Sequence, residues 1–336
     1  MKLRFCTLCS VLSVFAWAGD LPLAQATIYN FQTYDNPAGP AFNQLLGINN
    51  NGTIAGYYGS GAAGQPNNGY VLNTPNTYTN ENFPGSAQTQ VTGINNIGTT
   101  VGFWSNSNTG TDPNFGFVDN RGVFSNVNDP AVSSTPSVNQ LLGVNDHNVA
   151  VGFYMDSNGN SHSYTYTIAS NSFVPITYSN AVSLTATAIN NNSEIGGFYT
   201  NAGGATLGFI DSNGTFSSLN APNATATMFF GLNNYGVLVG QATIGGATDG
   251  IAYNSSNDLW QIINDPLGIG TTTLNGINDK GSIVGFYVDA LGNTDGLLAT
   301  PVSATPELPT GLLFGTGLIF MGMLGIRNRQ ILSGKT

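Results

Sequence analysis

One short pattern occurs six times along the sequence, and this repetition constrains the fold more than any other feature. Each copy has an apolar residue, an Asn, a polar turn and a second apolar run with a glycine, as in "GINNNGTIAGYY" (47–58). The copies begin at positions 47, 93, 143, 188, 231 and 276. In every copy the apolar residue precedes that glycine by eight positions: Ile48 and Gly56, Ile94 and Gly102, Val144 and Gly152, Ile189 and Gly197, Leu232 and Gly240, Ile277 and Gly285. This regularity indicates repeated units that stack on one another.

Each repeat predicts four short strands. In the first copy, "LLGIN" and "TIAGYY" flank Asn50-Asn51-Gly52, which is a strong hairpin signal. The runs "GYVLN" and "TYTNENF" follow around a second turn. Four strands in about 45 residues are typical of a propeller blade, whereas a two-helix repeat would need long runs with a 3.6-residue period. The sequence therefore predicts an all-β, six-bladed β-propeller.

The two ends of the repeat array predict how the ring closes. The sixth copy lacks a fourth strand before Pro301, and the stretch "TIYNFQTYDNP" precedes the first copy. The end of this stretch resembles the fourth-strand endings "SNVNDP" (125–130) and "QIINDP" (261–266). We therefore expect residues 27–34 to complete the sixth blade of a domain spanning 27–301, which would leave no unpaired sheet edge. An open β-solenoid is the alternative.

Composition and the N-terminus indicate an exported, folded protein. Only 7% of the residues are charged and 41% are hydrophobic, which argues against disorder, and the net charge of −10 excludes a nucleic-acid partner. Lys2 and Arg4 precede an apolar stretch that ends in Ala24-Gln25-Ala26, so residues 1–26 are expected to be a cleaved signal peptide. Both cysteines lie inside this segment, and the mature chain would therefore carry no disulfide.

Motifs for catalysis and metal binding are weak. Asp156, Asn158 and Asn160 place oxygen-bearing side chains at alternate positions, as in a calcium loop, but Asn and Asp are also favoured in turns. Glu81 and Glu194 are the only glutamates of the repeats and occupy unrelated repeat positions. No nucleophile motif, metal-ligand spacing or carboxylate pair is visible, so no catalytic residue and no cofactor are predicted.

Aromatic residues at one repeat position are the candidate ligand contacts. They follow the second apolar run at the edge of the variable loop, where they could stack on sugar rings or pack between blades. They are Tyr58, Trp104, Tyr154, Tyr199 and Tyr287. The loop after these aromatics differs most between copies, and specific function is expected there.

Residues 302–336 carry a three-part tail. Pro306, Glu307, Leu308 and Pro309 precede an uncharged apolar run (311–326), expected to be a single transmembrane helix, and Arg327 and Arg329 follow it. This tail resembles the PEP-CTERM sorting signal of Gram-negative bacteria, although Leu308 stands where that family has its second proline. The resemblance implies transient anchoring in the inner membrane, processing by an exosortase-type enzyme, and association with exopolysaccharide or the cell surface. A sortase signal and a plain membrane anchor are the alternatives.

The repeats are similar to HAF-type extracellular repeats, with a good match at "GINDKGSIVGFY" (276–287), although the usual His-Ala-Phe is absent. The resemblance covers residues 43–300 and implies an exported surface protein with no established activity. Three hypotheses follow: a non-catalytic surface or exopolysaccharide-associated protein, a glycan-binding lectin-like propeller, and a secreted hydrolase that uses aspartates.

Overall fold

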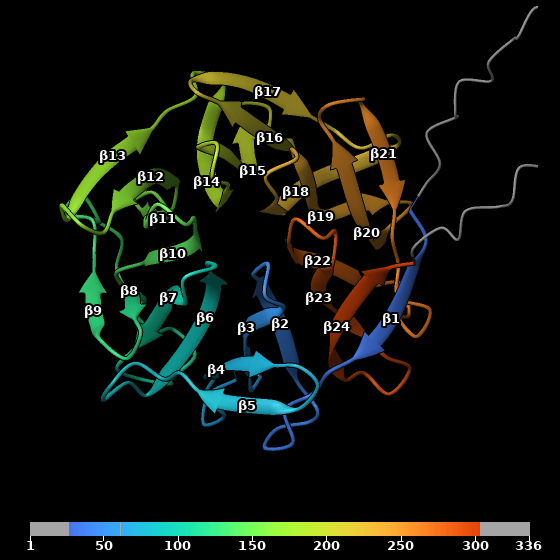
Figure 1. Cartoon of the computed structure of the whole chain (residues 1–336). Coiled ribbons are helices and arrows are strands. Elements are labelled where there is room, and N and C mark those ends of the chain that lie inside the picture. The colour runs from blue at the N-terminus through green and yellow to red at the C-terminus, as the bar shows by residue number, and fades with distance from the viewer. Residues whose placement is uncertain (1–26, 61, 303–336) are drawn as a thin grey trace, which may run out of the picture. The chain divides into compact units, whose positions relative to one another are not determined.

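The computed structural model describes residues 27–60 and 62–302, and these form six four-stranded antiparallel sheets arranged in a ring (Figure 1). Blades 1 and 2 contain β2 (Asn43–Ile48), β3 (Thr53–Tyr58), β4 (Asn68–Asn73), β5 (Thr77–Asn80), β6 (Gln88–Ile94), β7 (Thr99–Ser105), β8 (Phe115–Asn120) and β9 (Phe124–Val127). Blades 3 and 4 contain β10 (Asn139–Val144), β11 (Val149–Met155), β12 (Ser161–Thr167), β13 (Ser172–Ile176), β14 (Ala181–Ile189), β15 (Glu194–Asn201), β16 (Thr206–Ser212) and β17 (Thr215–Leu219). Blades 5 and 6 contain β18 (Ala224–Leu232), β19 (Val237–Ile244), β20 (Ala247–Asn254), β21 (Leu259–Ile262), β22 (Thr272–Ile277), β23 (Ile283–Val288) and β24 (Thr294–Pro301), with β1 (Tyr29–Thr33) as the outer strand of blade 6.

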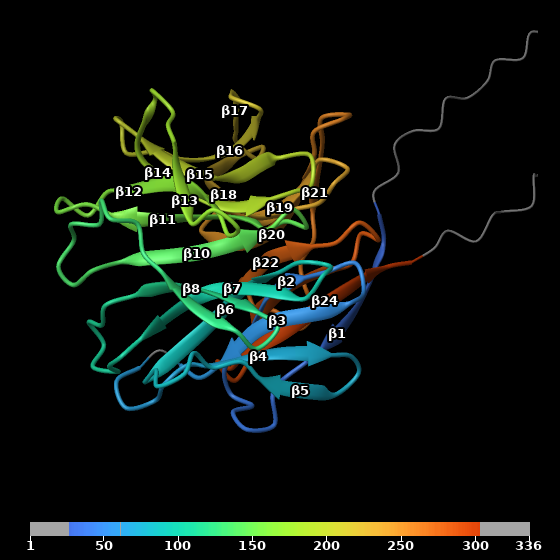
Figure 2. The same ribbon diagram turned by 60° about the vertical axis from the view of Figure 1, so that its left-hand side comes forward.

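The predicted six-bladed propeller is confirmed, and so is its closure by the N-terminal strand. The sheet order of blade 6 is β1-β24-β23-β22, and β1 lies beside β24 in both ribbon views (Figures 1 and 2). The backbone N–H of Tyr34 extends this pairing by donating to the carbonyl of Gly296 at 2.8 Å. The open solenoid is therefore wrong, because both ends of the array share one sheet.

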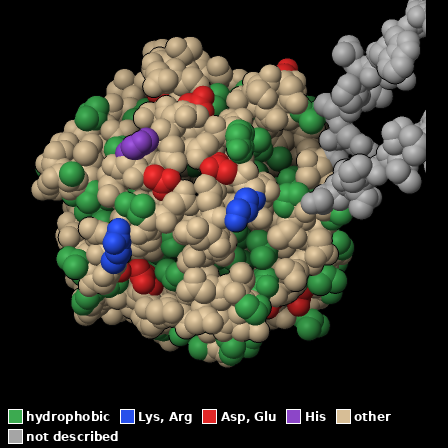
Figure 3. Space-filling model, in the orientation of Figure 1, with side chains coloured by type: hydrophobic (Ala, Val, Ile, Leu, Met, Phe, Trp, Pro, Cys, Tyr) green, Lys and Arg blue, Asp and Glu red, His purple; other side chains and the backbone are tan. Residues whose placement is uncertain are grey.

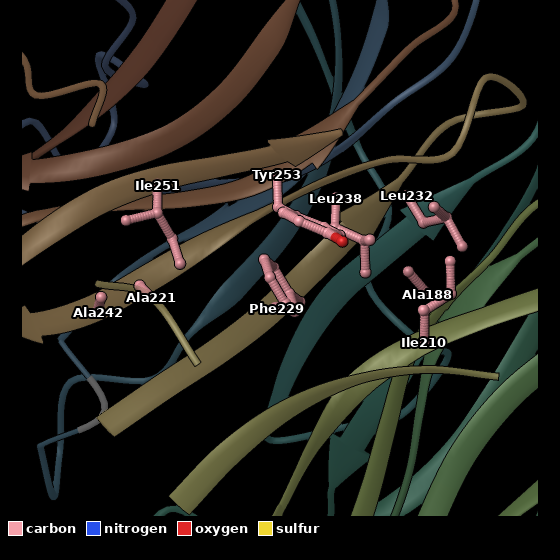
Figure 4. Packing of buried hydrophobic residues seen from close by; sticks show 9 residues of the cluster. All are labelled: Ala188, Ile210, Ala221, Phe229, Leu232, Leu238, Ala242, Ile251 and Tyr253. Carbon is pink, nitrogen blue, oxygen red and sulfur yellow. The ribbon is translucent and has the colours of Figure 1, made fainter. Parts of the chain in front are cut away.

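The hydrophobic core lies between neighbouring blades. One buried cluster combines Ala188 and Ile210 of blade 4 with Phe229, Leu238 and Ile251 of blade 5 (Figure 4). A single sheet buries its faces only against its neighbours, which is why the repeats must stack.

In blades 1 to 4 the glycine of the second strand makes room for an aromatic ring from the third strand; in blades 5 and 6 the residue opposite the glycine is Ile251 or Leu297. A Cβ at Gly102 would clash with the carbonyl oxygen of Gln90 and would lie 2.8 Å from the ring of Phe117, its partner on β8. Blades 1, 3 and 4 place Tyr70, Tyr164 and Phe209 at the same position. The glycine therefore accommodates this ring rather than the aromatic residue that follows it in sequence.

The Asn that follows the first apolar residue of each repeat joins the six blades around the central axis. Its Oδ1 accepts two backbone N–H groups of its own hairpin turn, as Asn49 does from Asn51 and Thr53. Its Nδ2 donates to the carbonyl oxygen of the corresponding Asn in the next blade, at 2.9–3.2 Å, and the six bonds form a closed circle. The members of this asparagine circle are Asn49, Asn95, Asn145, Asn190, Asn233 and Asn278. Only a side chain that both donates and accepts can do this, so Asp cannot replace Asn here.

The predicted signal peptide (1–26) and the predicted sorting motif and transmembrane helix (306–329) lie outside the described residues. Within 27–60 and 62–302, no helix has the length and apolarity needed to cross a membrane.

Candidate functional site

A cavity of about 200 Å³ lies beside the loops that join the second and third strands of blades 1 and 2. The loops between the second and third strands of blades 1 and 2 have nine residues each (59–67 and 106–114). The corresponding loops of the other four blades have five residues or fewer (156–160, 202–205, 245–246 and 289–293). The lining combines both long loops with the ends of β6 and β7, and includes Asn67, Gln88, Gln90, Phe103, Trp104, Asp112 and Asn114. We call this cavity the blade 1–2 pocket.

Asp112 holds the wall of the blade 1–2 pocket in place. Its carboxylate accepts bonds from the Ser107 hydroxyl at 2.6 Å, the backbone N–H of Thr109 at 2.9 Å and Nε2 of Gln88 at 3.0 Å. The Ser107 hydroxyl, followed by the N–H and hydroxyl of Thr109 and the N–H of Gly110, lowers the pKa of Asp112 to about 2. The pocket therefore carries a fixed negative charge at any physiological pH.

The indole ring of Trp104 lines the blade 1–2 pocket and is fixed by contacts with neighbouring side chains. Its indole stacks on Phe83 from blade 1, with ring centroids 4.4 Å apart and planes at 3°, and packs against Phe115 at 5.0 Å. Its Nε1 donates to Oδ1 of Asn126 at 3.0 Å. Trp104 thus packs between blades and also lines the pocket, where half-buried Phe103 lies next to it.

The other predicted stacking residues lie elsewhere in the ring. Tyr199 and Tyr287 are only 4% and 2% exposed, and their hydroxyls are hydrogen-bonded to Ser218 and Thr33. Tyr58 and Tyr154 are half-buried, and Tyr154 stacks on His162 at 5.2 Å. Of the five aromatics at this repeat position, Trp104 alone lines the blade 1–2 pocket.

The calcium candidate Asp156, Asn158 and Asn160 forms a turn closed by its own hydrogen bonds. Oδ1 of Asp156 accepts the N–H groups of Asn158 and Asn160 at 2.8 and 2.9 Å, and its Oδ2 lies 2.9 Å from Nε2 of His162. The part of the chain that the structure describes contains no group of three or more His, Cys, Asp or Glu placed to hold a metal ion.

The structure also brings acidic residues close together at positions where the sequence analysis predicted no carboxylate pair. Burial and neighbouring Asp119 raise the pKa of Glu81 to about 7, against a 2.7 Å bond from the Thr100 hydroxyl that lowers it. Asp35 and Asp295 form a second close pair in blade 6. None of these four acidic residues lines the blade 1–2 pocket.

Two further carboxylates stand in the mouth of the central channel. The residue after each Asn of the asparagine circle accepts the backbone N–H of its counterpart in the preceding blade, at 2.7–2.9 Å. This residue is Asp146 in blade 3 and Asp279 in blade 6, which lie across the ring from each other, and Asn in the other four blades. Oδ2 of each Asp accepts two side-chain amides of the flanking Asn residues, all at 2.7 Å.

The protonation of Asp146 reflects these bonds. Burial alone would raise its pKa, but the N–H of Asn96, the side-chain amides of Asn191 and Asn96, and nearby His147 together hold the pKa below its ordinary value. The oxygens of Asp146 therefore act as acceptors that link its blade to Asn96 and Asn191 of the two adjacent blades.

No protein-family model and no curated protein matches this sequence. Among solved structures, the chain is similar to AofleA from Arthrobotrys oligospora, with a TM-score of 0.52 and 10% identity over 84% of this chain and 91% of that chain. It is also similar to the Aleuria aurantia lectin in complex with Fucα1-6GlcNAc, with a TM-score of 0.49 and 12% identity over 80% of this chain and 98% of that chain. At these identities the likeness extends to the propeller fold alone.

Proposed function

We propose that this protein is a non-catalytic, carbohydrate-binding propeller that acts outside the cell, with the blade 1–2 pocket as its binding site. The observation that carries the proposal is the lining of this pocket, which combines primary amides, hydroxyls and two aromatic rings with a single charge. Amides and hydroxyls match the mixed donors and acceptors of a sugar, and aromatic carbon matches its apolar faces.

The size of the pocket supports a small hydroxylated ligand. A volume of about 200 Å³ corresponds to roughly seven water molecules at about 30 Å³ each. One sugar ring fits this space, whereas a folded protein partner would need a much larger surface.

The carboxylates of the blade 1–2 pocket and of the central channel support a non-catalytic role. Glycoside hydrolysis commonly uses two carboxyl groups, one with a raised pKa. The only carboxylate that lines the blade 1–2 pocket is Asp112, and its pKa is lowered to about 2. In the channel, Asp146 and Asp279 stand on opposite blades, and each accepts three bonds from neighbouring residues.

Action outside the cell is supported by the sequence. Residues 1–26 have the form of a signal peptide, and Pro306, Glu307, Arg327 and Arg329 resemble the sorting signal described above. We propose transient anchoring through 311–326, processing by an exosortase-type enzyme, and retention in the exopolysaccharide or at the cell surface. Mass spectrometry of the protein from the native cell surface should find neither end intact, and an intact C-terminus there would contradict the processing step.

A glycan array followed by calorimetric titration tests the binding function. We expect binding of at least one carbohydrate class by the purified protein, and loss of that binding in Phe103→Ala. Phe153→Ala is the matched control, because Phe153 has the same register position on β11 but does not line the pocket. A flat array, or equal losses in the two variants with equal thermal stability, would contradict the proposal.

A further inference from the structure

Gln90 differs from the glutamines at its own repeat position in blades 1 and 3. These residues lie opposite the aromatic residue of the second strand: Gln44 opposite Tyr57, Gln90 opposite Phe103, and Gln140 opposite Phe153. Gln44 accepts the Tyr57 hydroxyl at 2.8 Å, and Gln140 donates to Oδ1 of Asn114 at 2.5 Å. Gln90 faces a phenyl ring in place of a hydroxyl, and its side-chain amide has no hydrogen-bond partner among residues 27–60 and 62–302.

This unpaired amide lines the blade 1–2 pocket. A primary amide offers two N–H donors and a carbonyl acceptor, which suits two neighbouring hydroxyl groups of a ligand. Nearby Gln88 and Asn114 already have partners, which are Asp112 of the 106–114 loop for Gln88 and Gln140 of β10 for Asn114. Gln90 is therefore the amide most available for contact with a ligand.

The charge of the pocket limits which ligand can enter. Asp112 is its only charged side chain and is fixed in its ionised form. The only Lys and Arg residues of the described chain are Arg121 and Lys280, and neither lines the pocket, so no side-chain cation there can neutralise a carboxylate or sulfate. The face shown in Figure 3 has the same character, because uncharged polar groups and backbone cover most of it. An anionic sugar would meet repulsion and lose its hydration without gaining a counter-charge.

The lengths of the loops between the second and third strands limit the number of such pockets in the propeller. Asp112 fixes the 106–114 loop, and the opposite wall includes Asn67 at the end of the 59–67 loop. In blades 3 to 6 the loop between the second and third strands has five residues or fewer, although these blades repeat the same strands. The sixfold repeat therefore contains one pocket of this construction.

We infer that the blade 1–2 pocket binds one uncharged sugar unit per chain, and that Gln90 is the specificity-determining residue that contacts its hydroxyls. This inference rests on the proposed carbohydrate-binding function. It adds the charge class of the ligand, the stoichiometry and the contacting amide, none of which follows from carbohydrate binding in general.

Calorimetric titration with matched sugar pairs tests the inference. The probes are methyl glucoside with methyl glucuronide and methyl galactoside with methyl galacturonide, and within each pair a carboxylate replaces the C6 hydroxymethyl group. We expect a neutral member to bind with one site per chain, and its uronate to bind at least about tenfold more weakly. Gln90→Ala should weaken neutral-sugar binding by about tenfold, and isosteric Gln90→Glu, which loses both donors and adds a charge, by more.

Gln44→Ala is the control, because Gln44 has the same strand position but does not line the pocket. It should leave the affinity unchanged, and the thermal transition of each variant shows that it is folded. Binding of the uronates as tightly as the neutral sugars, more than one site per chain, or equal effects of Gln90→Ala and Gln44→Ala would overturn the inference while leaving carbohydrate binding in place. Binding of no carbohydrate on the wider array would overturn the proposed function itself.

Discussion

Asp35→Asn is expected to stabilise the propeller at neutral pH and to leave its stability nearly unchanged at pH 4. Asp35 follows β1, and its Oδ1 accepts the backbone N–H of Gly296 at 3.0 Å. Three other blades make the same bond with an amide oxygen, at 2.8–3.3 Å. These are Asn82 to Gly69, Asn128 to Gly116 and Asn264 to Gly250. The bond itself therefore does not require a carboxylate.

Blade 5 shows what the substitution would restore. There Asn264 also donates its Nδ2 to Oδ1 of Asp249 at 2.7 Å. Asp295 has the position of Asp249 in blade 6, so Asp35 places a second carboxylate where blade 5 has an amide donor. Burial, and then the charges of Asp295 and Asp289, raise the pKa of Asp35 from 3.8 to about 6 against the opposing Gly296 bond.

The sign and size of the effect follow from this pKa. A carboxyl group whose pKa is higher in the folded state stabilises the fold while protonated, and this contribution disappears as the pH rises from about 4 through about 6. The difference between 3.8 and about 6 would correspond to about 3 kcal/mol in a fully buried site. Asp35 is half-buried, and solvent screening reduces this value, so we expect a gain of about 1 kcal/mol at pH 7.5.

Urea unfolding followed by tryptophan fluorescence at pH 4 and pH 7.5 measures this gain. Asn264→Asp is the reverse substitution in blade 5, and it should destabilise the protein at pH 7.5 much more than at pH 4. An Asp35→Asn protein with the same gain at both pH values, or with no gain at pH 7.5, would refute the reasoning about the carboxylate pair.

Three further predictions concern buried polar groups. The hydroxyl of Tyr70 is buried without a hydrogen-bond partner in the described chain, whereas the hydroxyl of Tyr164, at the same position in blade 3, donates to Asn139 at 3.0 Å. Tyr70→Phe should therefore raise the free energy of unfolding by up to about 1 kcal/mol, and Tyr164→Phe should lower it by about 1 kcal/mol. Urea titration measures both changes, and changes of the same sign would contradict this prediction. Asn233→Asp keeps the acceptor of its turn but loses the donor to the carbonyl of Asn278. We therefore expect the free energy of unfolding to fall by about 1–3 kcal/mol and the thermal midpoint to fall with it. An unchanged midpoint would show that the asparagine circle is not needed for stability. Burial and Asp119 raise the pKa of Glu81 from 4.5 to about 7, so the stabilisation by its protonated form declines as the pH rises over this range. The gain in free energy of unfolding from Glu81→Gln should therefore be larger at pH 8 than at pH 5. Urea unfolding that gives the same gain at both pH values would contradict this titration.

The number of blades and the closure of the ring could be predicted from the sequence because they depend on local patterns. Asn50-Asn51-Gly52 and its counterparts predict hairpins, and the short apolar runs that flank these turns predict strands. The missing fourth strand before Pro301 and the spare strand after Thr27 predict the shared blade, since an unpaired sheet edge is unfavourable. These features are properties of neighbouring residues in the chain.

The second role of the asparagines in the circle could not be predicted from one repeat. The Oδ1 of each forms the local turn, which the sequence indicates, but its Nδ2 bonds to the next blade 43 to 50 residues further on, and Asn278 returns to Asn49. The acid pair Glu81 and Asp119 was missed for the same reason, because a loop of blade 1 meets a strand of blade 2.

The candidate site shows most clearly what sequence and tertiary structure each determine. By itself, the sequence determined that Trp104 stands at an aromatic repeat position, that the following loop is variable, and that basic residues are scarce. Only the tertiary structure decided that Trp104 stacks on Phe83 of the preceding blade and that two long loops enclose one cavity. It also decided that the amide of Gln90 lines this cavity with no hydrogen-bond partner among the residues that the structure describes. The physical reason is that a cavity depends on which side chains fill the space between two blades, and those side chains are distant along the chain.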